Sequence, residues 1–352
     1  MSTQPPDESP TPGSTSPRPS RRQRGRLEDY RVERRRAVRY RIAVIVTATL
    51  SWITWFTPAF LRYRIADLFG DLFFRMGPGY RANLIDNQRH LRPGAGDEAL
   101  LQSALSASRT SSRNFADLLL VPRVDRIRSV TRDPLIEGEW RYLDDALALG
   151  KGVIFLTAHL GPFDTLLHHL HHRGYRITAV TGRTTSRFVF DGVTWLRRFD
   201  NLDVVEASPS GVRRIYRALK RGECAAFLSD FDFFQSGREV TFFGSPTSLP
   251  QGAIRIARDT GAPIVPIFAR RIGHRNCLII HEAFMIDKTK DLEADVERGL
   301  RLATAALERA IGSTPDQWVM FQRVWPSEPA SPAPAVPDGA APGGAPSARS
   351  GA

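Results

Sequence analysis

Six short and nearly all-apolar runs alternate with helical segments, and this pattern constrains the fold more than any other feature. The runs, rich in β-branched and aromatic residues, cover 152–159, 176–182, 202–207, 224–230, 263–269 and 277–283. Helical patterns are expected at 163–172, 188–199, 211–221, 251–259 and 292–311. Runs of this kind are typical of strands buried on both faces of a sheet. We therefore expect an α/β fold with a mostly parallel central sheet and helices on both faces.

The two ends of the chain have compositions that do not favour a buried core. Residues 1–41 begin with a Pro/Ser/Thr-rich stretch and continue with dense arginine, eleven Arg against five acidic residues in all. We expect this segment to be a disordered, arginine-rich leader. Residues 327–352 are mostly Ala, Pro and Gly and are expected to form a disordered tail. The predicted organisation is therefore a leader (1–41), an anchoring segment (42–79), a folded domain (80–326) and the tail.

The anchoring segment begins with a long uncharged run. Residues 42–61 hold twenty residues without a charge, about 30 Å of helix at 1.5 Å per residue, which matches a bilayer core. A cleavable signal is not expected, because the basic leader is long and no small-residue cleavage site follows. The run predicts an N-terminal hydrophobic, membrane-associated helix that spans the bilayer, re-enters it or lies at its interface. A helix buried in a soluble protein is the alternative, since Thr, Ser and Pro interrupt the run.

An amphipathic helix is predicted directly after this run, over residues 65–79. Its apolar residues recur at steps of three and four, while Asp67, Asp71 and Arg75 take the opposite face. Such a helix suits the headgroup layer of a membrane, although it can equally pack on the protein.

The net charge of +12 raises the question of an anionic partner. Arginine makes up 45 of the 49 basic residues, a bias that genome composition explains at least as well as phosphate binding. The leader, with its local excess of arginine, is expected to attract an anionic membrane surface. The remaining excess is diffuse and lacks interleaved aromatic residues, so no nucleic-acid partner is expected.

Several function classes lose support from what the sequence lacks. The two cysteines, Cys224 and Cys277, are far apart and show no metal-binding spacing, which argues against a disulfide scaffold and a cysteine zinc site. There is no G-x-S-x-G elbow, no phosphate-binding P-loop motif and no strand-linked G-x-G-x-x-G. Serine hydrolases, P-loop NTPases and dinucleotide oxidoreductases are therefore disfavoured.

The positive signal lies at the end of the first strong strand, in TAHLGPFD (157–164). His159 and Asp164 are five residues apart and can meet only if the chain turns between them, and Gly161-Pro162 supplies a turn. A histidine at the carboxyl end of a parallel strand faces the crevice where such sheets bind ligands. A carboxylate on Nδ1 would leave Nε2 free to accept a proton. The alternative is a solvent-facing histidine beside an aspartate that only stabilises a helix N-terminus.

The H-x4-D pattern on a strand-to-helix turn resembles the mark of glycerolipid-type acyltransferases. The wider sequence is similar to the bacterial lipid A lauroyl/myristoyl acyltransferase family, including relatives that acylate phosphatidylinositol mannosides. The similarity covers roughly residues 40–326. The stretches that carry it are YRANL (80–84), GVIFLTAHLGPFD (152–164), ALKRGECAAFLSDFD (218–232), SGREVTFFGSPTSLPQGAIRIARDTGAPIVPIFARR (236–271) and PDQWVMFQRVW (315–325).

This resemblance implies an O-acyltransferase that moves a fatty acyl chain from acyl-CoA or acyl carrier protein to a glycolipid hydroxyl. The acceptor would resemble a phosphatidylinositol mannoside or lipid A. His159 would be the general base and Asp164 its orienting partner, without an acyl-enzyme. Arg183 and Arg187, in TGRTTSR, and Glu239, in SGREVTFFG, would bind substrate. The resemblance implies no metal or other cofactor, and a location at the cytoplasmic face of the plasma membrane.

Two other functions remain open at this point. The first is a lysophospholipid acyltransferase, whose acceptor would be a glycerol hydroxyl. The second is a membrane adaptor without catalysis, in which the leader and anchor bind anionic lipid and the dyad is vestigial.

Other polar residues favour structural interpretations. His168 and His172 are spaced as a metal pair on one helix, but no third ligand is evident, so we expect a polar helix face. Asp230 and Asp232 lie at a strand end, where they either cap the following loop or bind a cation. Arg197, next to another arginine, is expected on a solvated face.

Overall fold

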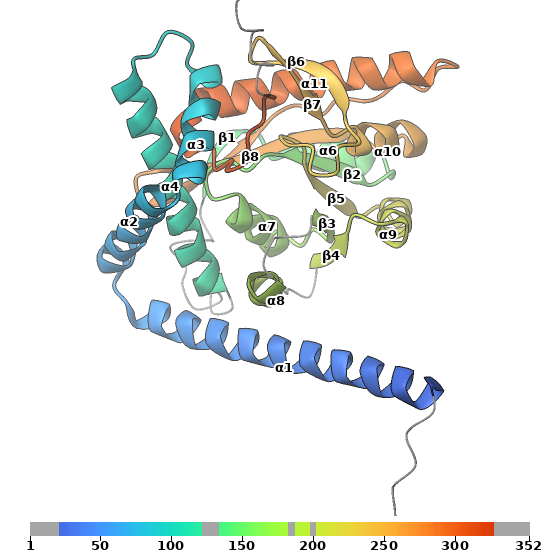
Figure 1. The fold of residues 1–352 in the computed structure, drawn as a ribbon. Helices are drawn as coiled ribbons and strands as arrows, with labels where there is room; N and C mark the ends of the chain where they lie inside the picture. The colour runs from blue at the N-terminus through green and yellow to red at the C-terminus, as the bar shows by residue number, and fades with distance from the viewer. Residues whose placement is uncertain (1–20, 122–133, 182–186, 198–201, 327–352) are drawn as a thin grey trace, which may run out of the picture.

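The computed structural model describes residues 21–121, 134–181, 187–197 and 202–326, without the side chains of 21–33, 35, 187 and 190. A seven-stranded sheet in the order β1-β9-β8-β2-β5-β3-β4 forms its centre (Figure 1). The strands are β1 (Leu135–Gly138), β2 (Val153–Thr157), β3 (Ile177–Thr181), β4 (Leu202–Glu206), β5 (Cys224–Leu228), β8 (Ile264–Ile272) and β9 (Arg275–Ile280). Only the β8–β9 pairing is antiparallel among the pairs of this sheet. The expected mostly parallel sheet is confirmed.

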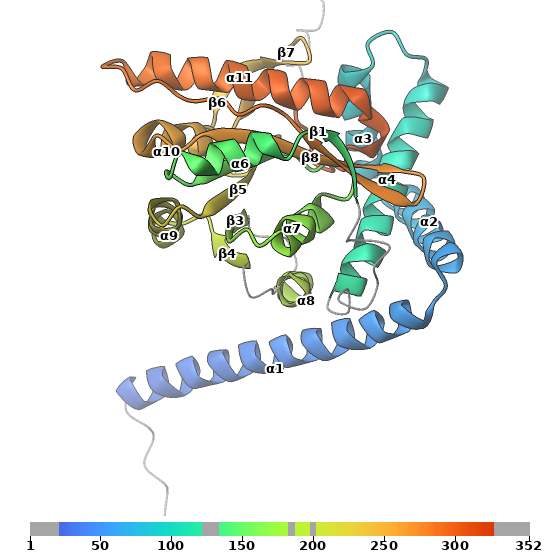
Figure 2. The same cartoon turned by 180° about the vertical axis from the view of Figure 1, so that it is seen from behind.

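Helices cover both faces of this sheet, as the apolar strands predict. Alternate residues of β2 point to opposite sides: Ile154 and Leu156 join one buried cluster, and Val153 and Phe155 join another. The first cluster includes residues of α9 (Pro209–Lys220), α10 (Gly252–Thr260) and α11 (Leu292–Ser313). The second includes residues of α6 (Arg141–Ala148) and α7 (Phe163–His172). Figure 2 shows α10 and α11 on one side of the sheet and α7 on the other.

The structure adds strands that the sequence pattern does not predict. These are the edge strand β1 and a separate antiparallel hairpin of β6 (Arg238–Phe242) and β7 (Ser245–Leu249). Phe243 and Gly244 turn the hairpin with φ values of 49° and 75°, as a two-residue hairpin turn requires. Both hairpin strands are half exposed, β6 contains Arg and Glu and β7 contains Pro and Ser, so they lack the apolar signal that identifies the central strands.

The N-terminal third is helical and differs from the expected organisation. It consists of α1 (Arg21–Phe56), α2 (Ala59–Met76), α3 (Pro78–Leu91) and α4 (Asp97–Leu120). Residues 21–41 lie within α1, where we expected a disordered leader; residues 1–20 and the predicted tail lie outside the described residues. The uncharged run 42–61 is not one helix, because Pro58 precedes α2 and has no N–H to continue α1. In the part of the chain that the structure covers, no helix has the length and apolar character to cross a membrane.

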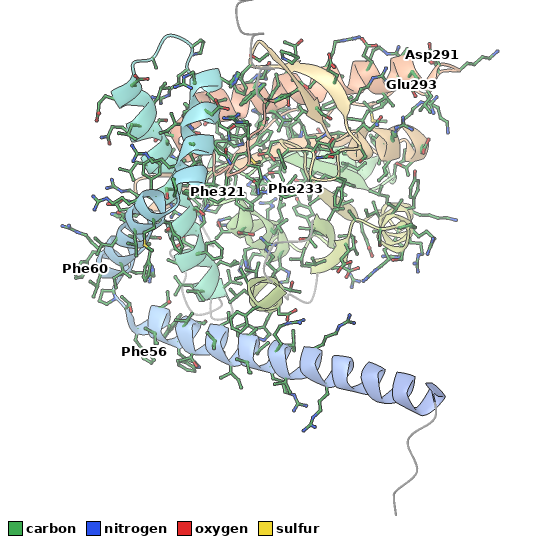
Figure 3. All side chains as sticks on the ribbon, viewed as in Figure 1. Phe56, Phe60, Phe233, Asp291, Glu293 and Phe321 are labelled. Carbon is green, nitrogen blue, oxygen red and sulfur yellow. The ribbon has the colours of Figure 1, made fainter. Side chains whose placement is uncertain are left out.

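The outer faces of α1 and α2 carry most of their large apolar residues, whereas their buried positions are mainly small or polar, apart from Tyr63 and Phe74 on α2. On α1, Ala43, Thr47 and Ser51 are buried. On α2, the aspartates of the predicted amphipathic pattern point inward, whereas its apolar stripe points away from the protein. At the junction of the two helices Phe56 and Phe60 are 73% and 71% exposed, and Figure 3 shows both side chains projecting outward. The exposed apolar residues of the two helices include Ile42, Ile45, Trp52, Ile53, Phe56, Phe60, Ile65, Leu68, Phe69, Leu72, Phe73 and Met76.

Ion pairs fix α2 against α4 in this orientation. The Nε atom of Arg113 lies 2.6 Å from Asp67 Oδ1, and that of Arg109 lies 2.5 Å from Asp71 Oδ1. Each arginine donates a second bond to the same carboxylate, a bidentate geometry that is stronger than a single contact. Arg109 holds the pKa of Asp71 below its ordinary value. A Cβ atom at Gly70 would lie 2.8 Å from the backbone of Arg109, so glycine permits this close crossing of the two helices.

Candidate active site

Two neighbouring parallel strands bring His159 and Asp230 together. Strands β2 and β5 pair in parallel, with Thr157 opposite Leu228. His159 and Asp230 each lie two residues beyond this pair, at the carboxyl end of their strands. The pairing register therefore places the imidazole and the carboxylate at the same edge of the sheet, where parallel sheets bind ligands.

The Asp230 carboxylate binds His159 twice. Its Oδ1 lies 2.9 Å from His159 Nδ1, and its Oδ2 accepts a hydrogen bond from the His159 backbone N–H at 2.9 Å. The indole Nε1 of Trp318 donates to the same Oδ2 at 2.8 Å. Asp230 is fully buried. Burial alone would raise its pKa, but the imidazole and these hydrogen bonds outweigh burial, so the pKa of Asp230 is lowered.

This arrangement determines which histidine nitrogen is available for chemistry. An ionised carboxylate only accepts hydrogen bonds, so Nδ1 of His159 carries the proton that binds Asp230. The other ring nitrogen, Nε2, then has a lone pair for an incoming proton donor. The His159 side chain keeps 19% of its surface exposed, so a substrate can reach it. A histidine that is oriented in this way by a buried carboxylate has the geometry of a candidate general base.

Asp164 has another partner. It is the second residue of α7, and its Oδ1 accepts a bond from Arg197 Nε at 2.9 Å; Nη2 of the same arginine binds the same oxygen. Within the described structure His159 is hydrogen-bonded to Asp230, and the predicted His159–Asp164 hydrogen bond is not formed. The physical reason is the turn at Gly161 (φ 50°), after which α7 directs Asp164 toward α8 (Arg187–Leu196) and Arg197 beyond it.

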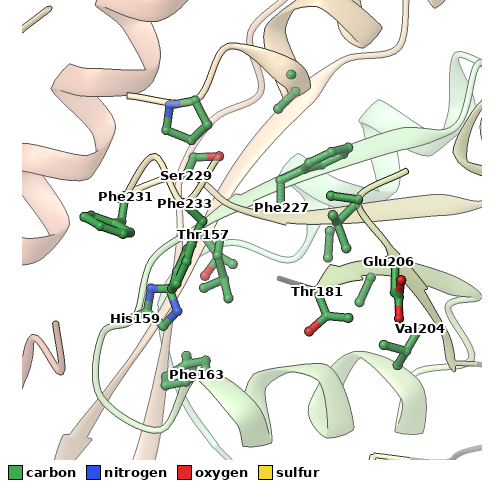
Figure 4. A pocket seen from close by; sticks show the side chains of 18 of the residues that line it. Thr157, His159, Phe163, Thr181, Val204, Glu206, Phe227, Ser229, Phe231 and Phe233 are labelled. Carbon is green, nitrogen blue, oxygen red and sulfur yellow. The ribbon is translucent and has the colours of Figure 1, made fainter. Parts of the chain in front are cut away.

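A pocket of about 1060 Å³ opens beside His159 and continues along the carboxyl edge of β2, β5, β3 and β4. Its size is at the upper end of ligand pockets, roughly 300–1,000 Å³. Three strand spacings of about 4.8 Å separate β2 from β4, so the pocket extends on the order of 14 Å across the sheet. Figure 4 shows His159 at one side, beside Phe163 and Phe233, and Val204 and Glu206 at the other. The His159 and Phe163 rings meet edge to face with centroids 5.2 Å apart.

The pocket wall is mostly apolar and comes from many elements. Its aliphatic and aromatic members include Leu118, Phe163, Leu166, Leu167, Val189, Val193, Val204, Val212, Ile215, Phe227, Phe231, Phe233 and Ile256. The lining also includes the guanidinium groups of Arg197 and Arg255. Arg255 donates from Nε to Gln251 Oε1 at 2.8 Å. A long apolar wall next to a carboxylate-bound imidazole suits a substrate with a hydrocarbon chain and one reactive polar end.

Of the three predicted substrate-binding residues, only Glu239 has a described side chain, and it lies outside the pocket lining. Arg183 lies outside the described residues, and Arg187 is the first residue of α8 with an undescribed side chain. Glu239 is exposed on β6, opposite Ser248, and does not line the pocket. Their roles therefore remain predictions from the resemblance.

The other polar residues considered from the sequence have mostly structural roles. Asp232 caps the loop before β6, since it accepts bonds from the backbone N–H groups of Ser236 and Gly237. His168 is buried and burial lowers its pKa well below the ordinary value. Over the described ranges, no three His, Cys, Asp or Glu side chains are grouped as a metal site would need.

Sequence reasoning missed Asp230 as the partner of His159, and it missed Arg197 as the partner of Asp164. Both candidate strand ends, 152–159 and 224–230, were visible in the sequence. What the sequence did not show was that these two strands, 65 residues apart in the chain, are neighbours in the sheet.

The fold and the site define an α/β enzyme with a carboxylate-oriented histidine at the edge of a long apolar pocket. A family model for bacterial lipid A biosynthesis acyltransferases matches residues 31–327. The chain belongs to this family, as the sequence resemblance predicted, and it is an acyltransferase of lipid biosynthesis.

Individual relatives agree with this assignment. The chain is 24% identical over 237 residues to phosphatidylinositol mannoside acyltransferase of Mycobacterium tuberculosis, in strains H37Rv and CDC 1551. The match covers 66% of this chain and 72% of each relative. A solved structure, the 1-acyl-sn-glycerophosphate acyltransferase PlsC from Thermotoga maritima, covers 70% of this chain and 97% of its own at 14% identity. Its TM-score of 0.32 is too low to support an argument.

Proposed function

We propose that this enzyme transfers a fatty acyl chain from acyl-CoA or acyl carrier protein to a hydroxyl of a glycolipid, with His159 as the general base. The observation that carries the proposal is the Asp230-bound imidazole at the edge of an apolar pocket. The similarity to a phosphatidylinositol mannoside acyltransferase favours a glycolipid acceptor of that kind, or one like lipid A.

In the proposed reaction the acceptor hydroxyl lies against Nε2 of His159. As its oxygen attacks the thioester carbonyl carbon, Nε2 takes the hydroxyl proton and the carbonyl electron pair moves to oxygen. The tetrahedral intermediate then collapses, the carbon–sulfur bond breaks, and the thiolate takes the proton from Nε2. Asp230 stabilises the imidazolium that exists between these two steps. The acyl group passes directly to the acceptor and no acyl-enzyme forms.

Asp164 has a positioning role in this scheme. Its ion pair with Arg197 joins the first turn of α7 to the end of α8, and both residues line the pocket. Asp230 therefore takes the orienting role that the H-x4-D pattern suggests for Asp164, and Asp164 holds the pocket wall next to the base.

The acyl chain of the donor would occupy the apolar pocket. The wall offers aliphatic and aromatic side chains from α4, α7, α8 and α9 as well as from the strands. Burying each methylene contributes about 0.8 kcal/mol, so a long chain gains enough binding energy to hold the thioester in place. Arg255 and Arg197 are the described cations at this site that suit an anionic donor or acceptor headgroup.

We also propose that the outer surface of α1 and α2 binds the anionic cytoplasmic surface of the plasma membrane. Most of the large apolar residues of these helices face away from the protein, which is the reverse of a helix that packs on a soluble core. Beneath this surface α1 packs on α8, where Arg39 lies 3.0 Å from Asp191 and Thr47 lies against Gly192. α8 lines the pocket and packs on α1, so the proposed membrane-binding helix is one helix layer away from the pocket that would receive a lipid acceptor.

The test is an acyl-transfer assay with the purified enzyme in detergent. The protein is incubated with labelled palmitoyl-CoA, or with palmitoyl-acyl carrier protein, and with the total lipid extract of its host, and products are analysed by mass spectrometry. We expect a lipid that gains one acyl mass with the wild type and not with His159→Ala. A product that forms equally with His159→Ala would overturn the mechanism. A diacyl phospholipid formed from a lysophospholipid, in place of an acylated glycolipid, would overturn the acceptor assignment.

A further inference from the structure

A buried polar network connects α2 to the turn that follows His159. The Tyr63 hydroxyl donates to Asp117 Oδ1 at 2.8 Å, and Arg271 Nη2 donates to Asp117 Oδ2 at 2.6 Å. The same Nη2 lies 3.3 Å from Asn114 Oδ1, and Asn114 Nδ2 donates to the Gly161 carbonyl at 2.5 Å. The network therefore runs from a side chain of α2, through two residues one turn apart on α4, to the backbone next to the proposed base.

All four side chains of this network are buried. The exposed fractions are 6% for Tyr63, 1% for Asp117, 8% for Arg271 and 3% for Asn114. Burial alone would lower the pKa of Arg271, but the Asp117 carboxylate raises it above its ordinary value, so Arg271 stays charged. A buried charge without its partner is strongly unfavourable, so each member restricts where the others can lie.

The turn at Gly161 is held from several sides. A Cβ atom at Gly161 would lie 2.5 Å from the Ala269 carbonyl oxygen, so the turn lies directly on the backbone of β8. The Gly161 N–H donates to the Gln317 carbonyl at 2.9 Å, while its own carbonyl accepts the Asn114 bond. The Gln317 side chain in turn binds the backbone N–H and carbonyl of Arg271. His159 is two residues from this fixed point.

We propose that Asn114 is a positioning residue for the acyltransferase reaction, and that Tyr63, acting through Asp117 and Arg271, ties it to α2. Asn114 also lines the pocket, so it joins the base, the pocket wall and the helix with the exposed apolar stripe. This inference rests on the proposed function, since it concerns how His159 is placed for that reaction. A displacement of α2 would be transmitted through this chain of hydrogen bonds to the turn at Gly161, two residues from His159.

The experiment compares Asn114→Ala, Tyr63→Phe and the matched control Tyr80→Phe in steady-state acyl transfer. Tyr80 is half-buried, and its hydroxyl donates a hydrogen bond to Ser108 Oγ on α4 at 3.1 Å. Unlike the Tyr63 bond, this bond is not part of the network that reaches Gly161. Misplacement of a catalytic group by about 1 Å can cost on the order of 100-fold in rate. We therefore expect kcat to fall about 10- to 100-fold for Asn114→Ala and about fivefold for Tyr63→Phe, with KM for the donor nearly constant. Tyr80→Phe should keep its kcat within about twofold.

A second readout does not depend on turnover. The imidazole ¹⁵N NMR signals of His159 are assigned among the eight histidines by comparison with His159→Gln. We expect Asn114→Ala and Tyr63→Phe to shift or broaden them, while Tyr80→Phe leaves them in place. Thermal unfolding identifies any variant that fails to fold. If Asn114→Ala fails to fold, Tyr63→Phe, which removes a single oxygen atom, still tests the network.

The outcomes separate this inference from the proposed function. Absence of His159-dependent transfer by the wild type would overturn the proposed function, while the NMR comparison would still test the network. Unchanged kcat and unchanged His159 signals in folded Asn114→Ala and Tyr63→Phe would overturn the positioning role. Equal effects of Tyr63→Phe and Tyr80→Phe would overturn the link to α2.

Discussion

His159 and Asp230 follow the carboxyl ends of two adjacent parallel strands, and the Nδ1 and Oδ1 atoms of their side chains are 2.9 Å apart. The carboxylate that orients the proposed base thus comes from the neighbouring strand, while the aspartate of the local H-x4-D pattern binds Arg197. This division of roles between two aspartates can be tested by matched substitutions.

Asp230→Asn and Asp164→Asn should have very different effects on the rate. An asparagine at 230 no longer favours the tautomer with the proton on Nδ1, so kcat should fall about 10²- to 10⁴-fold, the range of general-base contributions. Asp164→Asn loses an ion pair but leaves His159 bound to Asp230. The fold-decrease in kcat for Asp164→Asn should therefore be at least about ten times smaller than the decrease for Asp230→Asn. Steady-state kinetics on both variants, with circular dichroism to show that each is folded, measures the difference. A larger loss for Asp164→Asn would return the orienting role to the H-x4-D pair.

Val204→Phe should shift the preferred acyl chain to shorter lengths. Val204 lines the pocket on β4, three strands from His159, so added volume there shortens the space for the end of the chain. We expect kcat/KM for palmitoyl-CoA to fall at least about tenfold relative to decanoyl-CoA, given the usual discrimination of a hydrophobic pocket between chain lengths. Val240→Phe, on the hairpin and outside the pocket lining, is the control and should keep the wild-type ratio. The same ratio for both variants would place the acyl chain elsewhere.

Phe56→Ser combined with Phe60→Ser should weaken binding to vesicles and leave the fold stable. Both rings are largely exposed, so they contribute little to folding, but each would contribute about 1.5 kcal/mol or more when buried in lipid. We expect partitioning into phosphatidylglycerol/phosphatidylcholine vesicles to fall about 100-fold, with an unchanged Tm. Leu149→Ser combined with Leu302→Ser removes two other exposed apolar side chains, at 54% and 49% exposure, and should not alter partitioning. Equal partitioning of both double variants would remove α1 and α2 as the membrane-binding surface.

Asp295→Asn should change how stability depends on pH. Asp295 is fully buried in α11 and accepts bonds from Arg258 Nε at 2.7 Å and from the Thr289 N–H at 2.8 Å. Burial opposes its charge, but these bonds lower its pKa below the ordinary value of 3.8. A carboxylate with a lowered folded-state pKa stabilises the protein above its ordinary pKa, and this contribution is lost as pH falls through the folded-state pKa. The Tm difference between wild type and Asp295→Asn should therefore be largest near neutral pH and shrink below about pH 4; a constant difference across that range would contradict the assignment.

The central sheet was predictable because its signal is local. Four of the six apolar runs that we expected as strands contain an observed strand and the other two overlap β8 and β9, and the helix expected at 163–172 has the observed bounds of α7. Strands buried on both faces need apolar residues at every position, so the sequence shows them directly. The half-exposed β6–β7 hairpin has no such run, and it was missed for that reason.

The orientation of the amphipathic helix α2 could not be predicted from the sequence. The sequence defines an apolar face and a charged face, but it does not say which of them meets the protein. Asp67 and Asp71 pair with Arg113 and Arg109 on α4, so these two aspartates face the protein and the apolar stripe faces outward. The partners are about 40 residues away in the chain, so no local pattern could reveal this orientation.

The sequence by itself determined the α/β class, the apolar strands, the histidine at a strand end and the acyltransferase family. These features depend on residue type, on short-range spacing and on motifs along the chain. Only the tertiary structure decided that Asp230 binds His159, that Asp164 binds Arg197 and that the apolar stripe of α2 faces outward. Each of these depends on which distant segments become neighbours, and strand order and helix packing are set by the whole core and not by any single segment.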